Sequence, residues 1–175
     1  MIEPLFSVVS AVPDELVQVH EETKVMDDNA VRGTNFTCFH AGPKEGWTQF
    51  RLEPPEVPMP TRGKLFLRNL LGTAGLEISL NVVPPGKGMP FLHKHQQNEE
   101  VYLVIGGQGQ FLVDGDCIDV KEGSVLRISP PGARAWHNNS DAPLYFLCFQ
   151  YRADSVIQGG TLDGQGVEGT PSWSS

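Results

Sequence analysis

The sequence predicts an all-β domain, a sandwich or barrel of short strands, on three observations. The chain has 175 residues, which is the length of one domain with a sizeable core. Its 19 glycines and 14 prolines are many for this length, and they favour short strands joined by tight turns. Short apolar or alternating segments recur from residue 65 to residue 152, and no long helical repeat interrupts them.

The part of the chain before residue 61 is expected to be an N-terminal extension with edge strands. Residues 34–40 and 48–52 are two short candidate strands. Residues 53–63 hold four prolines, which predicts a loop or an extended crossing. We therefore assign residues 1–60 to the extension.

Residues 61–152 are expected to form the barrel. Residues 76–83 alternate apolar and polar side chains, which predicts a strand with two distinct faces. Asp114-Gly115 predicts a tight hairpin turn with positive φ. The other predicted strands are 65–70, 101–105, 110–113, 117–120, 124–129 and 144–152. Residues 153–175 are rich in Gly, Ser and Thr, and we expect a flexible C-terminal tail.

Charge and composition exclude several partners. The formal net charge of −8 argues against nucleic acid and anionic membranes. No run of 18 apolar residues is present, and the first residues lack the basic region of a signal peptide. The three cysteines, Cys38, Cys117 and Cys148, are widely spaced and odd in number, so we expect small buried hydrophobes rather than a disulfide framework. A cytoplasmic location is expected.

The segment from Gly86 to Gly109 carries the candidate chemistry. His93 and His95 are two residues apart, so on an extended chain both imidazoles point to one side. Glu100 can join them if the chain turns between. Two imidazoles and one carboxylate suit a divalent transition metal, with positions left open for water or substrate.

The spacing His-x-His-x4-Glu-x6-Gly, ending at Gly107, resembles the first motif of the cupin superfamily, G-x5-H-x-H-x3,4-E-x6-G. The fit is imperfect upstream, where Gly86 is one residue too far from His93 and Gly88 one too near. The resemblance implies a double-stranded β-helix, the cupin or jelly-roll barrel. It also implies that His93, His95 and Glu100 bind Fe, Mn, Ni or Zn.

The second cupin motif, G-x5-P-x-G-x2-H-x3-N, matches residues 123–139 in two ways. Aligning Pro130-Pro131-Gly132 with P-x-G needs an inserted residue, and His137 could then reach the metal as a fourth ligand. The alignment without a gap, which we favour, puts Arg134 in the histidine slot and Asn138 in the asparagine slot. His137 then points outward.

An arginine at position 134 changes the expected chemistry. Arginine stays protonated and offers no lone pair to a metal, but it can bind a carboxylate or phosphate with two hydrogen bonds. Arg134 is therefore a candidate substrate-binding residue. The alternative is a salt bridge to an acidic loop residue or to Glu100. A pair with Glu100 would compete with metal binding by that glutamate.

Two aromatic residues complete the candidate site. Tyr102 lies two residues after Glu100 and shares its face, where it either lines the pocket or fills the barrel. Phe91 shares a face with His93 and is a candidate pocket wall. We expect a metal-binding cupin that acts on a small, anionic organic molecule, or a cupin that binds such a ligand without turnover. The catalytic residues, the substrate and the reaction are not indicated. We also expect a homodimer, with residues 1–60 at the interface.

Overall fold

The structure is a computed structural model that describes residues 29–53, 55, 57, 59–156, 160 and 163–173. The chain divides into two compact units, residues 1–40 and 41–175. In the first unit, β1 (Ala30–Arg32) pairs antiparallel with β2 (Thr37–Phe39). Residues 1–28 of that unit lie outside the described residues. The predicted strand at 34–40 is thus confirmed in its central part.

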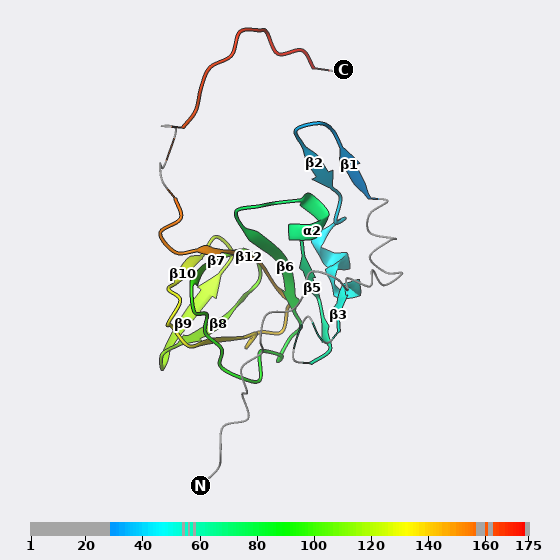
Figure 1. The fold of residues 1–175 in the computed structure, drawn as a ribbon. Helices are drawn as coiled ribbons and strands as arrows, with labels where there is room; N and C mark the ends of the chain where they lie inside the picture. The colour runs from blue at the N-terminus through cyan, green and yellow to red at the C-terminus, as the bar shows by residue number, and fades with distance from the viewer. Residues whose placement is uncertain are drawn as a thin grey trace. The chain divides into compact units, whose positions relative to one another are not determined.

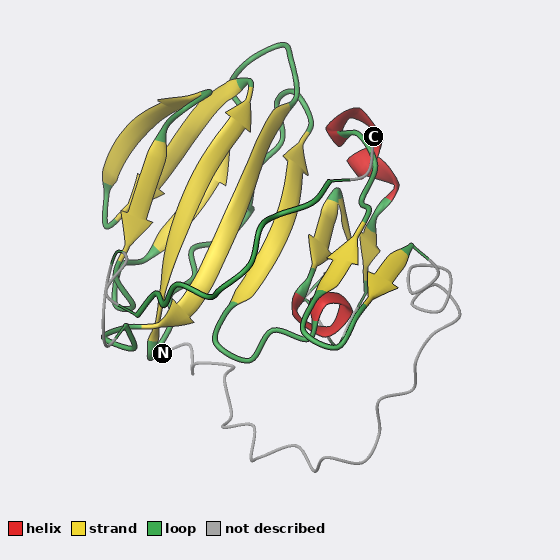
Figure 2. Ribbon diagram, turned by 90° about the horizontal axis from the view of Figure 1, so that it is seen from above, coloured by secondary structure: helices red, strands yellow, loops and turns green. Residues whose placement is uncertain are grey.

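The second unit contains two antiparallel sheets that stand side by side as a barrel (Figures 1 and 2). The first has five strands in the order β10-β7-β12-β6-β5, and the second has three in the order β11-β8-β9. The all-β prediction is confirmed. The strands are β5 (Lys64–Phe66), β6 (Glu77–Val83), β7 (Asn98–Gly106), β8 (Gln108–Val113), β9 (Asp116–Lys121), β10 (Val125–Ile128), β11 (Arg134–His137) and β12 (Leu144–Arg152).

The apolar core of the barrel draws on strands of both sheets. Tyr102 on β7, Phe111 on β8 and Phe146 on β12 are almost completely buried, with ring centroids 4.8 to 5.8 Å apart. Their edge-on and tilted contacts add to the free energy of burying large apolar surfaces. The other buried core residues are Val83, Val104, Val120, Ile128, Leu144 and Cys148.

Short elements that precede β5 in the chain contact β5 and β6. A 3-10 helix, η1 (Lys44–Gln49), buries Trp47 and contacts β6. The short strands β3 (Arg51–Leu52) and β4 (Thr61–Arg62) pair with one another. The strand predicted at 48–52 is therefore wrong in its first half, because the Trp47 side chain is buried from a helical turn.

The strand predicted at 65–70 is also wrong in its second half, where α2 (Arg68–Leu71) begins after β5. The backbone amides of Leu67 and Arg68 donate to the carboxylate of Glu77, which satisfies free N–H groups at the helix start. Gly72, at φ 71°, ends the helix in the left-handed conformation.

Two turns contain residues with positive φ at positions that the sequence marks with glycine. Asp114 and Gly115 have φ values of 51° and 100° between β8 and β9, which confirms the predicted hairpin. Gly107, the last glycine of the first motif, has φ 78°, and a Cβ there would lie 2.2 Å from the carbonyl oxygen of Pro143. Both its φ and this close contact therefore require glycine.

The cysteine prediction is only partly right. Cys148 is buried in the core, but Cys38 and Cys117 are exposed. Cys117 lies on β9, where only the alternate face turns inward. Beyond β12, the described residues from 163 to 173 are all exposed, including Trp173 at 87%.

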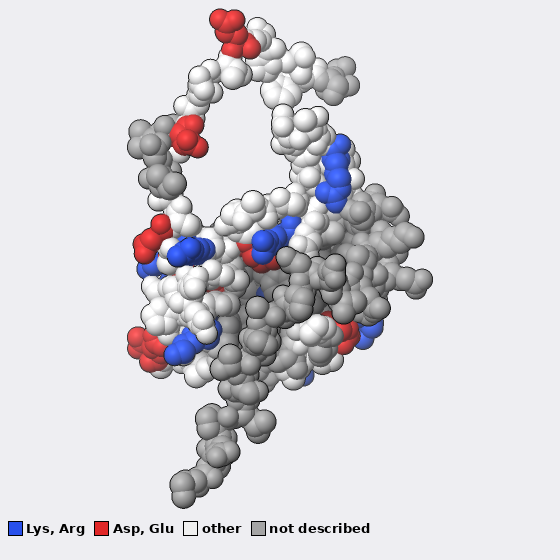
Figure 3. All heavy atoms as spheres, in the orientation of Figure 1, with Lys and Arg blue, Asp and Glu red and all other residues white. Residues whose placement is uncertain are grey.

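The surface carries both signs of charge. On the face shown in Figure 3, Lys and Arg side chains lie in separate groups between Asp and Glu rather than in one basic surface. Among the described residues, helices long and apolar enough to span a membrane are absent.

Candidate metal centre

The segment that carries both histidines runs antiparallel to β11. His93 and Arg134 exchange two backbone hydrogen bonds, of 3.1 and 2.8 Å. The amide of Met89 donates to the carbonyl of Trp136 at 2.9 Å. Gly88 permits this approach, because a Cβ there would lie 2.5 Å from the carbonyl oxygen of Trp136. The two histidines therefore lie on an extended segment bonded to β11, not within a long regular strand.

The structure brings His93, His95 and Glu100 together. Each offers a ligand atom, and the three atoms lie within 4.8 Å of one another. The imidazole rings meet edge to face, with centroids 5.6 Å apart. Glu100 comes from β7, whose register sets it opposite Ile128 of β10 and Gln150 of β12. The site thus depends on strand pairing as well as on the motif.

The two oxygens of Glu100 have different partners. Oε2 accepts hydrogen bonds from the Tyr102 hydroxyl and from Arg134, whose Nε and Nη2 lie at 2.9 and 2.6 Å. Oε1 lies 3.2 Å from Nε2 of His95 and accepts a hydrogen bond of 2.8 Å from Gln150. The oxygen that faces the histidines is therefore not the one bound to Arg134.

Arg134 is fully buried and pairs with Glu100. Its Nη1 donates to the carbonyl of Gly132 at 2.9 Å, so all three guanidinium nitrogens are engaged. Asn138 is also fully buried, whereas His137 is exposed, as the ungapped alignment of the second motif expects. His137 does not belong to the group formed by His93, His95 and Glu100.

Hydrogen bonds keep Glu100 ionised. Burial alone would raise its pKa, but hydrogen bonds from His95, Tyr102, Arg134 and Gln150 outweigh burial and hold the pKa well below its usual range. Burial lowers the pKa of His93, and the charge of Arg134 lowers it further against the opposing effect of Glu100. The site therefore combines an anionic carboxylate with a neutral imidazole at neutral pH.

Two protic groups beside Glu100 stay protonated. Burial raises the pKa of the Tyr102 hydroxyl far above its usual range, and the charge of Glu100 and the hydrogen bond to it add to the effect. Burial and then Glu100 raise the pKa of the Cys148 thiol to about 12. Tyr102 is therefore a hydrogen-bond donor to Glu100 and part of the core, and Cys148 is not a thiolate nucleophile.

The remaining predicted site residue, Phe91, lies 39% exposed on the segment that precedes His93. Sequence reasoning missed Gln150, whose Nε2 lies 2.9 Å from Nε2 of His95 and bonds Glu100. It also missed Lys64 of β5, which enters the polar interior of the barrel. Both reach the site through pairing of distant strands, for which the sequence carries no local signal.

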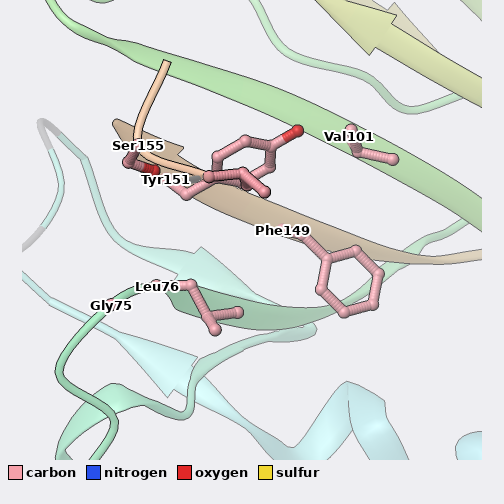
Figure 4. Close-up of a pocket in the computed structure, with 7 residues that line it drawn as sticks. Gly75, Leu76, Val101, Phe149, Tyr151 and Ser155 are labelled. Carbon is pink, nitrogen blue, oxygen red and sulfur yellow. The ribbon is translucent and has the colours of Figure 1, made fainter. Parts of the chain in front are cut away.

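An apolar hollow lies elsewhere on the five-stranded sheet, near the end of β12 (Figure 4). It contains none of the candidate metal ligands. Its lining residues are Gly75, Leu76, Val101, Phe149, Tyr151, Ser155 and Val156.

Comparison with known proteins gives this architecture a family. A sequence profile described as the cupin domain matches residues 79–150, which include both motifs. The crystal structure of a cupin protein from Bacteroides fragilis is 40% identical, with a TM-score of 0.56, over 60% of this chain and 88% of that chain. The chain belongs to the cupin superfamily. An uncharacterised protein of Methanocaldococcus jannaschii is 34% identical over 70 residues, which are 40% of this cupin and 55% of the archaeal chain.

The residues of this cupin fit a transition metal. Nδ1 of His93 is buried without a hydrogen-bond partner among the described residues, so its lone pair is free to bind an ion. The neutral state of His93 and the anionic state of Glu100 are the forms that ligate metals. His93, His95 and Glu100 could therefore hold a metal ion, whose identity these residues do not fix.

Proposed function

We propose that this cupin binds one divalent transition metal, Fe, Mn, Ni or Zn, and acts on a small organic anion in its barrel. The observation that supports the proposal most directly is the convergence of His93, His95 and Glu100, whose ligand atoms lie within 4.8 Å of one another. The Nδ1 of His93, which has no partner among the described residues, adds to it. When bound, such an ion would polarise an oxygen atom of the substrate or activate water or O₂.

The chain's own residues prepare this site before any ligand arrives. Arg134 and Tyr102 hold one oxygen of Glu100, which fixes the carboxylate and keeps it ionised. Nε2 of Gln150 donates to Glu100 and lies 2.9 Å from Nε2 of His95, so the amide helps to set the position of the imidazole. Such outer partners set the geometry of metal ligands. We propose this positioning role for Arg134, because its guanidinium nitrogens are already engaged.

Metal analysis of tag-free protein tests the proposal. We expect close to one transition-metal ion per chain, and loss of that ion in the double variant His93→Ala/His95→Ala. The exposed His137 supplies a matched control, so His137→Ala should keep its metal. Full metal content in the double variant would overturn the proposal, and loss of metal in His137→Ala would restore His137 as a fourth ligand.

A second candidate function is ligand binding without turnover. It is favoured by Arg134, which stands at the position of the histidine in the second cupin motif. The candidate metal site therefore has three protein ligands, His93, His95 and Glu100, rather than four. Mass spectrometry of the protein as purified would identify a retained small molecule. Incubation of that molecule with fresh metal-loaded protein then separates the two functions, because a binder returns it unchanged and an enzyme converts it.

A further inference from the structure

The barrel holds a second polar cluster, centred on Lys64 of β5. Its ammonium donates to Oγ of Ser79 at 3.2 Å and to Oδ1 of Asn81 at 2.9 Å. Ser79 and Asn81 are buried on β6, on the same strand face as each other. Lys64 itself is partly buried, as are the neighbouring Phe66 and Trp136.

Lys64 has no counter-ion among the described residues, and burial lowers the pKa of its ammonium. Among the described residues, no carboxylate lies within ion-pair distance of its Nζ. The two carboxylates whose charges act on it from further away are committed elsewhere, Glu100 to Arg134 and Glu77 to the start of α2. Since Arg134 and Glu100 neutralise each other, the described residues leave the Lys64 ammonium without a partner of opposite charge, and an anion bound there would favour its charged form.

Hydrogen-bond counting shows unused donors at the same place. Asn81 Nδ2 donates to the carbonyl of Ser79 and to its Oγ, both at 3.0 Å, so Oδ1 must face the ammonium. Oγ of Ser79 thus accepts two hydrogen bonds, from Lys64 and from Asn81, and both of its lone pairs are occupied. The hydroxyl proton of Ser79 has no acceptor among the described residues. The Lys64 ammonium has a third N–H group in addition to the two that donate to Ser79 and Asn81.

The cluster adjoins the candidate metal centre. The Lys64 ammonium lies 5.9 Å from the centre of the Trp136 ring, and Trp136 contacts His93 with centroids 5.8 Å apart. On the other side, Ser79 pairs with Cys148 across β6 and β12, and Cys148 lies 3.5 Å from Oε1 of Glu100. One small molecule could therefore contact both places.

We propose that Lys64, with the hydroxyl of Ser79, is the receptor for a carboxylate group of the ligand. One ammonium and one hydroxyl donor match the charge and the two oxygens of a single carboxylate. Trp136 supplies an apolar surface between this receptor and the histidines. This inference rests on the proposed function in that the ligand is a small organic anion, and it transfers anion recognition from Arg134 to Lys64.

Acetate titration tests the receptor. The probe is sodium acetate at constant ionic strength, and the readout is the indole N–H resonance of Trp136, assigned with Trp136→Phe. We expect a saturable shift in the wild type that is about tenfold or more weaker in Lys64→Met, the size of a lost charge-assisted hydrogen bond. Lys64→Arg should retain part of the binding, and the neutral isostere acetamide should bind poorly.

Controls separate this receptor from the metal proposal. Lys44→Met, at an exposed surface lysine, should bind acetate like the wild type. Ser79→Ala, expected to weaken acetate severalfold, serves if Lys64→Met does not fold. Wild-type affinity in Lys64→Met or in Ser79→Ala, or equal binding of acetamide, would overturn the receptor even if the protein binds metal. Lys64-dependent acetate binding in a chain that binds no metal would support the receptor and contradict the metal proposal.

Discussion

At the scale of the residue, the candidate site depends on how the carboxylate of Glu100 is shared. One oxygen is fixed by Arg134 and Tyr102, and the other faces His95 and Gln150. A buried ion pair adds little net stability compared with apolar packing, because both charges lose their hydration. Its value here is positional, since it holds an ionised oxygen beside two imidazoles.

Removal of Arg134 should be costly. Arg134→Met leaves the buried charge of Glu100 without its partner, and we expect a loss of about 3–5 kcal/mol in the free energy of unfolding. Urea denaturation measures it. The matched control is Arg127→Met, because Arg127 pairs with Glu99 but is 59% exposed, so its loss should be about 0–1 kcal/mol. Equal losses in the two variants would contradict the assignment of Arg134 as a buried structural partner.

The lowered pKa of Glu100 predicts a dependence of stability on pH. An unfolded glutamate takes up its proton near the ordinary value of 4.5, whereas the folded one does so at a lower pH. The unfolded state therefore binds more protons as the pH falls below about 4.5, and stability is lost on the way down. Metal-free protein should show a steeper fall between pH 5 and pH 3 than Glu100→Gln, by urea denaturation. An identical pH profile in the variant would sink this prediction.

At the scale of the element, β6 shows that an alternating sequence does not tell which face of a strand lines the interior. Its sequence predicts a strand with an apolar and a polar face, and the structure confirms the strand. The polar face, with Ser79 and Asn81, is buried and points toward Lys64, while Leu80 and Val82 are buried on the other face. A pattern of period two fixes the two faces of a strand but not which one lines the interior.

The turn at Gly107 offers a test of backbone geometry. Gly107→Ala combines the strain of a positive φ with a clash against Pro143, and we expect a loss of more than about 2 kcal/mol. Gly123→Ala is the control, because φ there is 86° but nothing lies within 4 Å of an added Cβ. It should lose only about 1 kcal/mol, the cost of the left-handed conformation. Thermal unfolding measures both losses, and equal decreases in the melting temperature of the two variants would contradict the clash.

The sequence predicted what local patterns determine. The all-β fold, the turn at Asp114-Gly115 and the meeting of His93, His95 and Glu100 follow from periodicity, turn residues and motif spacing. It failed at α2 and at the end of η1, where the strands predicted at 65–70 and 48–52 overlap helical turns. Gln150 and Lys64 could not be predicted, since strand register places them at the site.

At the scale of the whole molecule, the chain after the barrel should be dispensable. The described residues from 163 to 173 are exposed throughout and bury no apolar side chain. A truncation that removes residues 157–175 should leave the melting temperature within about 1 °C of the full chain, because the described part of this segment buries no apolar side chain. Calorimetry checks this, and a lower melting temperature would assign the tail a structural role.

The assembly we expect is a symmetric homodimer to which residues 1–60 contribute. β10 is an edge of the five-stranded sheet, and its Val125 is 66% exposed. The apolar hollow lies on the same sheet, and a second copy would cover both the open edge and the apolar surface.

Light scattering at high micromolar concentration should give twice the chain mass, and Val125→Lys should shift the mass toward that of the monomer. Val167→Lys, in the exposed tail, is the control and should stay dimeric. Deletion of residues 1–28, which lie outside the described residues, should also loosen the dimer. A monomeric wild type would contradict the assembly. Residues 44–49, where Trp47 is buried and η1 contacts β6, would then be expected to cover their own barrel.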